Sequence, residues 1–184
     1  MKSFLIGSCL ILSILMCNAQ TTGTKIMNTS VKSQAKEDAL AAAIFQAFKK
    51  GSSDKWLQLY PTDQEYEAML QKLFAAKSKG LTQQTMAEMM AHRKREAALV
   101  YHTEFTHLLQ QADSIGIQWQ RAVFQKFYFD ASNAAHLELK YLNGDIWFHC
   151  GNRHFVVEGI EAIEMGAQYK LQSVKGLRQV DDGD

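Results

Sequence analysis

Residues 136–150 read HLELKYLNGDIWFHC and carry the clearest structural signal in the chain. Polar and apolar residues alternate on both sides of Asn143-Gly144, as they do in strands that bury one face. Because an Asn-Gly pair tolerates the positive φ angles of a type I′ turn, the pattern predicts a β-hairpin that turns there. Gly151-Asn152 predicts a second turn directly afterwards.

The sequence around this hairpin predicts an antiparallel sheet of about five strands. The first strand, residues 117–129, has apolar residues on both faces, which predicts that it is covered on both sides or enclosed by the curvature of the sheet. Residues 130–133 are predicted to form a turn, and Gly159 predicts a bulge or bend within a later strand. The remaining strands are predicted over residues 136–142, 145–150, 154–165 and 168–174.

The sequence upstream of the sheet predicts helices, because apolar residues recur there at three- and four-residue spacing. Gly51 suits the C′ position of the first helix. Thr62 and Glu65 form a capping box for the third, and Thr82 caps the fourth. A break in the long fourth helix near residues 92–95 stays an open alternative. The predicted helices cover residues 35–50, 52–60, 62–80 and 82–112.

Helices followed by strands predict an α+β fold, with N-terminal helices packed on one face of a twisted antiparallel sheet. This element order over residues 35–175 resembles the NTF2-like and cystatin-like superfamilies, which implies helices in the concavity of a bent sheet. NTF2-like folds usually place a hairpin between their helices, and this sequence has none before Ile117. The resemblance rests on element order, so it assigns no functional residue.

The first nineteen residues predict a secretory signal peptide. Lys2 is followed by an apolar segment, residues 4–16, and small residues precede a cleavage site after Ala19. The segment resembles export signals of Bacteroidota and predicts a periplasmic or secreted protein. The alternative is lipid attachment at Cys17, which Met16 disfavours because lipoprotein signals normally have a small residue there.

Removal of this segment would leave one domain over residues 35–180, a flexible lead-in at 20–34 and a polar tail at 181–184. The basic residues would fall from 20 to 19, matching the 19 acidic residues, so nothing indicates binding to nucleic acid. Only Cys150 would remain of three cysteines, so no internal disulfide is expected. No transmembrane segment is expected after removal of the signal peptide.

Three groups of residues could carry chemistry, and each has a plainer explanation. His102, Glu104 and His107 share a predicted helix, but no second such motif completes a metal site. Glu158 and Glu164 are expected on one face of a strand, with Glu161 on the other, so no acid–base pair is indicated. The third group surrounds the second turn and consists of His149, Cys150 and His154.

Zinc could bind at this turn, but a structural zinc site needs four ligands, so no metal or cofactor is predicted. Cys150 is expected to be a small buried side chain. It could alternatively act as a nucleophile with His136 or His154 as base, although no motif of cysteine enzymes surrounds it.

The leading prediction is a non-catalytic exported domain that binds a small apolar ligand or a protein partner. Its ligand site is predicted in the gap between helices and sheet, lined by Trp119, Phe124, Trp147 and Phe148. The alternative is a small enzyme with a His/Glu acid–base pocket. That alternative requires at least two of the following residues to meet in one cleft: His102, Glu104, His107, His136, His149 and His154.

Overall fold

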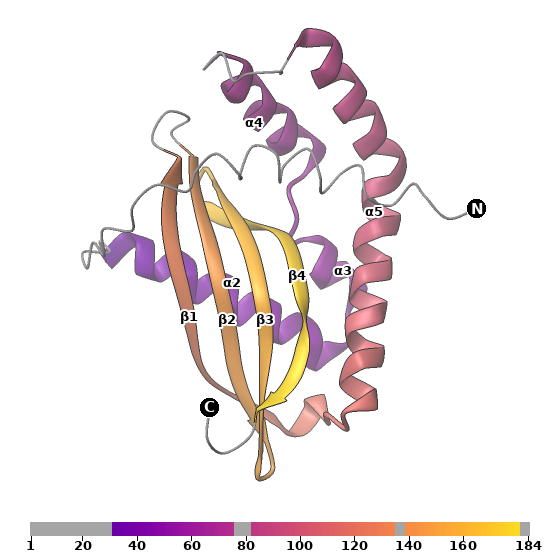
Figure 1. Ribbon diagram of the computed structural model, residues 1–184, viewed down its shortest axis with the longest axis vertical. Coiled ribbons are helices and arrows are strands. Elements are labelled where there is room, and N and C mark those ends of the chain that lie inside the picture. Colours follow the sequence, from indigo (N-terminus) through magenta and orange to yellow (C-terminus); the bar gives the residue numbers. More distant parts are fainter. Residues whose placement is uncertain (1–30, 76–81, 135–138, 181–184) are drawn as a thin grey trace. The chain divides into compact units, whose positions relative to one another are not determined.

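The computed structural model describes residues 31–75, 82–134 and 139–180 and has an α+β fold (Figure 1). Within these residues, four α-helices and one short 3₁₀ helix precede a four-stranded antiparallel sheet. The helices are α2 (Val31–Lys50), α3 (Ser53–Leu57), α4 (Asp63–Ala75), α5 (Gln83–Ser114) and the 3₁₀ helix η1 (Trp119–Arg121). The strands are β1 (Ala122–Ala134), β2 (Leu139–Cys150), β3 (Arg153–Met165) and β4 (Gln168–Val180).

The helix boundaries follow local capping signals, and these predictions are confirmed. Gly51 has a φ angle of 55° at the end of α2. The Thr62 hydroxyl accepts from the Glu65 amide at 3.2 Å, and the Glu65 carboxylate accepts from the Thr62 amide at 2.7 Å. Thr82 caps α5 through the Thr85 amide. Helix α2 begins before the predicted start at Ala35, α5 is continuous without a break at 92–95, and the predicted end of the third helix at Gly80 lies outside the described residues.

The predicted turn at Asn143-Gly144 is wrong, because these residues lie inside β2. Strand β1 continues through residues 130–133, which were predicted to be a turn, so Asn143 pairs with Asp130 and Gly144 pairs with Phe129. The sheet therefore has four strands instead of about five. Gly144 has no positive φ angle. A Cβ at that position would overlap the carbonyl oxygen of Tyr128, so glycine serves here to let two backbones approach closely.

The start of the first strand was predicted wrongly, whereas the second turn and the bulge at Gly159 were predicted correctly. Residues 117–121 are not strand: Ile117 is buried in a connection, and η1 follows it before β1 begins at Ala122. The turn at Gly151-Asn152 joins β2 to β3 as predicted. Gly159 also behaves as predicted, because it has a φ angle of 62° beside a break in the β2–β3 register.

The bulge at Gly159 reverses the expected distribution of three glutamates. Val157 and Ile160 both point into the core, so the alternation of side chains is inverted between them. Glu158 and Glu161 therefore share the outer face, whereas Glu164 points to the helix side and forms an ion pair with Lys36 of α2. The prediction that Glu158 and Glu164 share a face is wrong.

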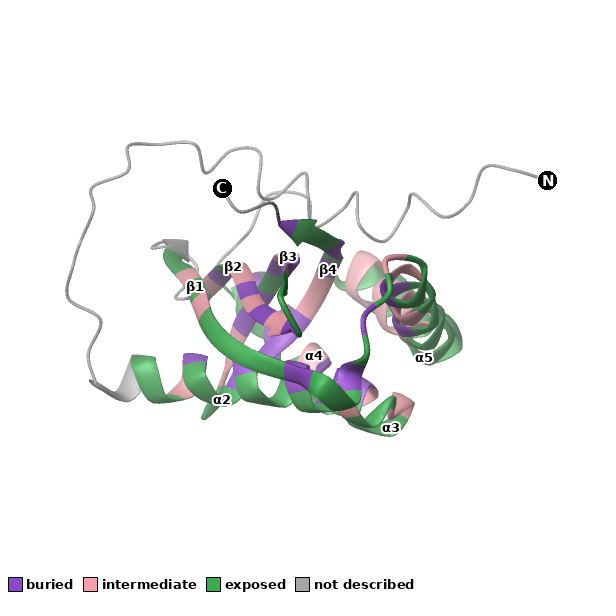
Figure 2. Ribbon diagram, turned by 90° about the horizontal axis from the view of Figure 1, so that it is seen from below, coloured by how far each residue is buried: buried purple, intermediate pink, exposed green. Residues whose placement is uncertain are grey.

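The core lies between the sheet and the helices (Figure 2). Helix α2 lies along one face of the sheet, and α5 lies beside β4. A second, smaller cluster joins Met69, Leu70 and Leu73 of α4 to Leu139 and Ile163 of the sheet. Since Ile163 is adjacent to Ala162 of the main cluster, the two point to opposite faces, and α4 covers the outer face at this end.

Candidate functional site

Two of the predicted ligand-binding residues, Trp119 and Phe148, are packed inside the main core. The Trp119 ring stacks on Phe48 with 4.6 Å between centroids and on Phe148 with 5.1 Å. The Phe45 ring lies 5.7 Å from Phe148 in the same layer. Neither of the two clefts described below is lined by these residues. A ligand at this position stays a prediction.

The other two predicted residues lie on different sides of the sheet. Phe124 is 37% exposed, and its ring lies 5.7 Å from Phe45 at the β1 side of the core. Trp147 points to the opposite face from Phe148, its neighbour in β2, and the Lys126 ammonium lies 5.1 Å from its ring. The structure thus brings three of the four predicted residues together around α2 and separates Trp147 from them.

The candidate acid–base residues of α5 do not meet in a cleft. The His102 Nδ1 lies 2.7 Å from the Ser53 hydroxyl at the surface, and His107 is exposed. Glu104 points instead toward β4, where its carboxylate accepts from the Val174 amide at 2.9 Å. These three side chains have different neighbours, which gives no support to an acid–base pair or a shared metal.

The candidate residues of the β2–β3 hairpin divide between the two faces of the sheet. The His149 and His154 rings are neighbours, with 6.2 Å between centroids. Cys150 is buried on the core face, where its Sγ lies 3.5 Å from the Gln118 carbonyl oxygen. His136 lies outside the described residues. Across residues 31–75, 82–134 and 139–180, no three His, Cys, Asp or Glu side chains are placed to share a metal ion.

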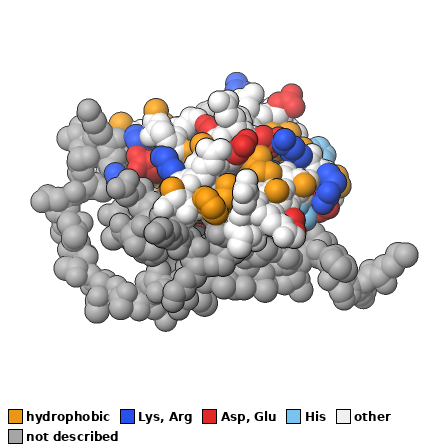
Figure 3. Space-filling model, turned by 90° about the horizontal axis from the view of Figure 1, so that it is seen from above, with side chains coloured by type: hydrophobic (Ala, Val, Ile, Leu, Met, Phe, Trp, Pro, Cys, Tyr) orange, Lys and Arg blue, Asp and Glu red, His pale blue; other side chains and the backbone are white. Residues whose placement is uncertain are grey.

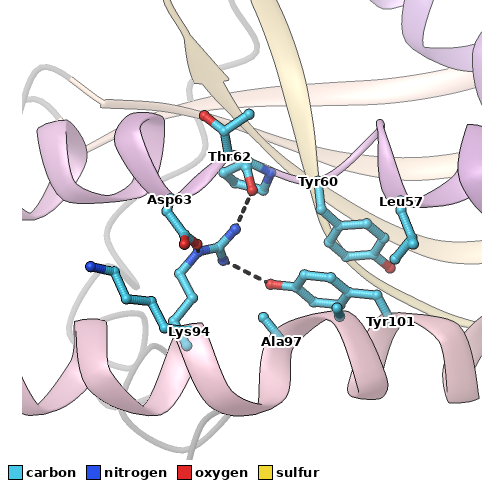
Figure 4. Close-up of a pocket in the computed structure, with 10 residues that line it drawn as sticks. Leu57, Tyr60, Thr62, Asp63, Lys94, Ala97 and Tyr101 are labelled. Carbon is cyan, nitrogen blue, oxygen red and sulfur yellow. Dashed lines mark hydrogen bonds and ion pairs between the residues drawn. The ribbon is translucent and has the colours of Figure 1, made fainter.

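A cleft of about 230 Å³ lies between α5 and the segment that links α3 to α4 (Figure 4). Arg93 of α5 occupies it: its Nε donates to Asp63 at 3.0 Å, its Nη1 to the Tyr101 hydroxyl at 3.0 Å, and its Nη2 to the Pro61 carbonyl. The guanidinium also lies 4.6 Å from the Tyr66 ring centroid. Because the Arg93 nitrogens are engaged by the protein itself, we assign this cleft the role of holding α4 against α5.

Next to this cleft, a buried polar chain connects α5 to the sheet. The Tyr60 ring stacks on Tyr101 with 3.7 Å between centroids, and its hydroxyl donates to the Glu104 carboxylate. Burial raises the pKa of the Glu104 carboxyl, although hydrogen bonds from Tyr60 and Val174 partly offset the rise. Burial and the nearby Glu104 charge also raise the pKa of Tyr60. This chain of hydrogen bonds links α5 and the segment after α3 to β4.

The hydrogen bond from Val174 to Glu104 is one of three that close the β4 edge of the sheet. An edge strand normally presents unpaired backbone groups that can pair with another chain. Three amides along β4 find acceptors in the helical part of the chain instead. The pairs are Leu171 with the Leu59 carbonyl at 2.8 Å, Val174 with Glu104 at 2.9 Å and Leu177 with the Gln111 side-chain oxygen at 3.1 Å.

The other edge, β1, is open among the described residues. Strand β1 is thirteen residues long and has only β2 as a neighbouring strand. Val123 and Tyr128 on the outer face are 51% and 59% exposed, and Phe124 on the inner face is 37% exposed. We call these three residues the edge patch. The prediction that both faces of this strand are covered is wrong, because Val123 and Tyr128 are exposed on its outer face. Lys126, also exposed, is a candidate that the sequence did not single out.

A second cleft, of about 370 Å³, lies where α4 meets the β3–β4 hairpin. Its lining combines Met69, Leu139 and Met165 with charged residues such as Glu65 and Lys72. Figure 3 shows this end of the described part, where hydrophobic, basic and acidic side chains are interspersed. The mixture of charges gives no preference for an anionic or cationic ligand.

The comparisons with known proteins bear on the fold. No protein-family model matches the chain, and no curated protein matches it. Among solved structures, it resembles a cystatin-like protein from Ruminococcus gnavus, with a TM-score of 0.56 and 15% sequence identity. The match covers 82% of this chain and 46% of that one, so this chain spans about half the length of that protein.

At this identity the likeness concerns the fold alone, and it supports the predicted resemblance to cystatin-like α+β folds. Among the described residues, no helix combines the length and the apolar character that crossing a membrane requires. The predicted signal peptide and the Cys17 alternative lie outside the described residues.

Proposed function

We propose that this chain is an exported, non-catalytic domain that binds a protein partner by adding a strand to the open edge of β1. The observation that carries the proposal is the difference between the two edges of the sheet. Polar side chains and a loop carbonyl satisfy three amides of β4. At β1, the Ala122 carbonyl at the start of the strand accepts from the Lys49 ammonium at 3.0 Å, and the strand beyond the bulge at Phe124 presents its edge together with the edge patch. An extended segment that pairs with such an edge gains main-chain hydrogen bonds and side-chain contacts together.

Two further observations support a protein partner over a small apolar ligand or an enzyme. The aromatic residues Phe45, Phe48, Trp119 and Phe148 contact one another in the gap between helix and sheet. The candidate acid–base side chains are dispersed over α5 and the β2–β3 hairpin. The export in this proposal rests on the signal peptide predicted for residues 1–19.

The proposal is tested by selecting peptide ligands from a displayed library on the purified protein and mapping them by hydrogen exchange. We expect selected peptides to slow exchange of β1 amides and to leave β4 amides unchanged. The double variant Phe124→Ser/Tyr128→Ser should weaken peptide binding about tenfold or more, because both exposed rings contribute to strand docking.

The matched control is Leu99→Ser/Val100→Ser, which removes two exposed apolar side chains from α5, 68% and 42% exposed, and should leave binding unchanged. Protection of α5 or of the α4 cleft in place of β1, or equal loss of binding in both double variants, would contradict the proposal.

A further inference from the structure

We propose that the strand added to β1 is β1 of a second copy of this chain, so that two sheets join into one across a twofold axis at Tyr128. This inference rests on the proposed function, because it names the partner that the open edge takes up. Twofold dimers are the commonest protein assemblies, and their interfaces must be complementary to themselves.

The length of β1 sets where such an axis would lie. The strand runs from Ala122 to Ala134, so Tyr128 is its middle residue. Antiparallel pairing about Tyr128 places each residue opposite one equally far on the other side of the middle. A bulge between Phe124 and Lys126 interrupts the strand, so the regular overlap runs from Lys126 to Asp130 on each copy. Tyr128, 59% exposed, lies at the centre of this segment and meets its own counterpart.

On the outer face, this register pairs two opposite charges. Lys126 and Asp130 lie two residues on either side of Tyr128, and both are exposed. Neither forms an ion pair within the part of the chain that the structure describes; the Lys126 ammonium lies 4.9 Å from the Tyr128 ring. In the dimer, Lys126 would face Asp130 of the second copy, and the twofold axis would create this pair twice.

On the inner face, the same register pairs two aromatic residues. Phe127 and Phe129 are half-buried against the main core, with 5.0 Å between their ring centroids. Phe127 would lie opposite Phe129 of the second copy, again twice. Aromatic pairs directly across neighbouring strands stabilise sheets, so the apolar layer would continue from one copy into the next.

Other registers lack this complementarity. Residues directly opposite one another in a sheet share a face, so the axis can move only by whole residues along β1. An axis at Phe127 would place Lys126 opposite Tyr128, and an axis at Phe129 would place it opposite Ser132. Both charges would then lack a charged partner, which singles out Tyr128.

The experiment is analytical ultracentrifugation of the purified protein and of charge-reversal variants at low salt. Lys126→Glu and Asp130→Lys should each weaken dimerisation about tenfold or more, because like charges then face each other at two symmetric places. The double variant should dimerise like the wild type, and an equimolar mixture of the two single variants should dimerise better than either alone. Lys175→Glu, on the exposed outer face of β4, is the control and should have no effect.

The register is tested separately by cross-linking. Tyr128→Cys should form an intermolecular disulfide with oxidised glutathione, because the two residues would meet on the axis. Ser132→Cys should not, because the two copies of residue 132 would lie about 27 Å apart along the strands.

Two outcomes would overturn the inference. The first is a monomer at every concentration that can be reached. The second is a dimer that neither charge reversal weakens. If selected peptides still protect β1 in either case, the proposed function stands and only the identity of the partner is wrong. If nothing protects β1, both fail.

Discussion

Replacement of Glu104 gives the sharpest test of how the β4 edge is closed. The Glu104 carboxylate accepts from the Tyr60 hydroxyl and from the Val174 amide at 2.9 Å, and Tyr60 and Val174 are only 2% and 7% exposed. Glu104→Ala leaves two buried donors without an acceptor, and each loss costs about 1–3 kcal/mol. We expect the free energy of unfolding to fall by about 2–6 kcal/mol.

The measurement is urea unfolding followed by tryptophan fluorescence and circular dichroism, with two comparison variants. Glu104→Gln retains one carbonyl acceptor and should lose about 1 kcal/mol. Glu96→Ala, on the same helix, removes an exposed ion pair with His92 and should change stability by less than about 0.5 kcal/mol. A loss in Glu104→Ala no larger than the loss in Glu96→Ala would refute the bridging role.

The pH dependence of the free energy of unfolding provides an independent test of the role of Glu104. Burial raises the pKa of Glu104 in the folded protein, so the native state binds a proton at a pH where the unfolded chain has lost it. The contribution of Glu104 to stability therefore falls as pH rises from the unfolded pKa through the folded one. The wild type should therefore gain stability relative to Glu104→Gln as pH is lowered through this window. A difference in the free energy of unfolding that stays the same at every pH would contradict the raised pKa of Glu104.

Three further predictions concern other parts of the fold. Gly144→Ala should destabilise the protein by about 3 kcal/mol or more in urea unfolding, because the new Cβ would overlap a β1 carbonyl. The control is Gly151→Ala, where the Cβ would meet open space at a φ angle of 64°, and it should cost only about 1 kcal/mol. Arg93→Lys should lower thermal stability, because one ammonium cannot replace three directed contacts, whereas Lys94→Ala should have little effect. At Glu164, the burial that would raise the pKa is outweighed by the hydrogen bond and charges of two lysines, so its pKa is lowered. It contributes stability above the unfolded pKa that is lost as pH falls through the folded one, and Glu164→Gln should be less sensitive to acid in a pH series.

The helical half of the fold could be predicted because its signals are local. The reciprocal hydrogen bonds of Thr62 and Glu65, and the cap at Thr82, involve residues three apart in the sequence. Gly51 ends α2 through its own φ angle. Such interactions form within one helical turn, so residue type and spacing are enough to locate them.

The sheet could be predicted only in part, because pairing depends on partners distant in sequence. Asn143-Gly144 is compatible with a hairpin turn, but β1 extends to Ala134 and keeps these residues inside β2. The bulge at Gly159 was signalled by the glycine, yet its effect on the faces of Glu158 and Glu164 depends on the register with β2. Local pattern cannot supply that register.

Residue order alone thus established the α+β class, the helix caps and the alternation that marks strands, because these arise from neighbours along the chain. Only the tertiary structure established which strand lies at an edge and which edge is closed. Val123, Phe124 and Tyr128 are apolar in the sequence whether β1 is central or outermost. Within the described residues, β1 pairs with β2 alone and so has an open edge, while Glu104 and Gln111 of α5 satisfy amides of the opposite edge.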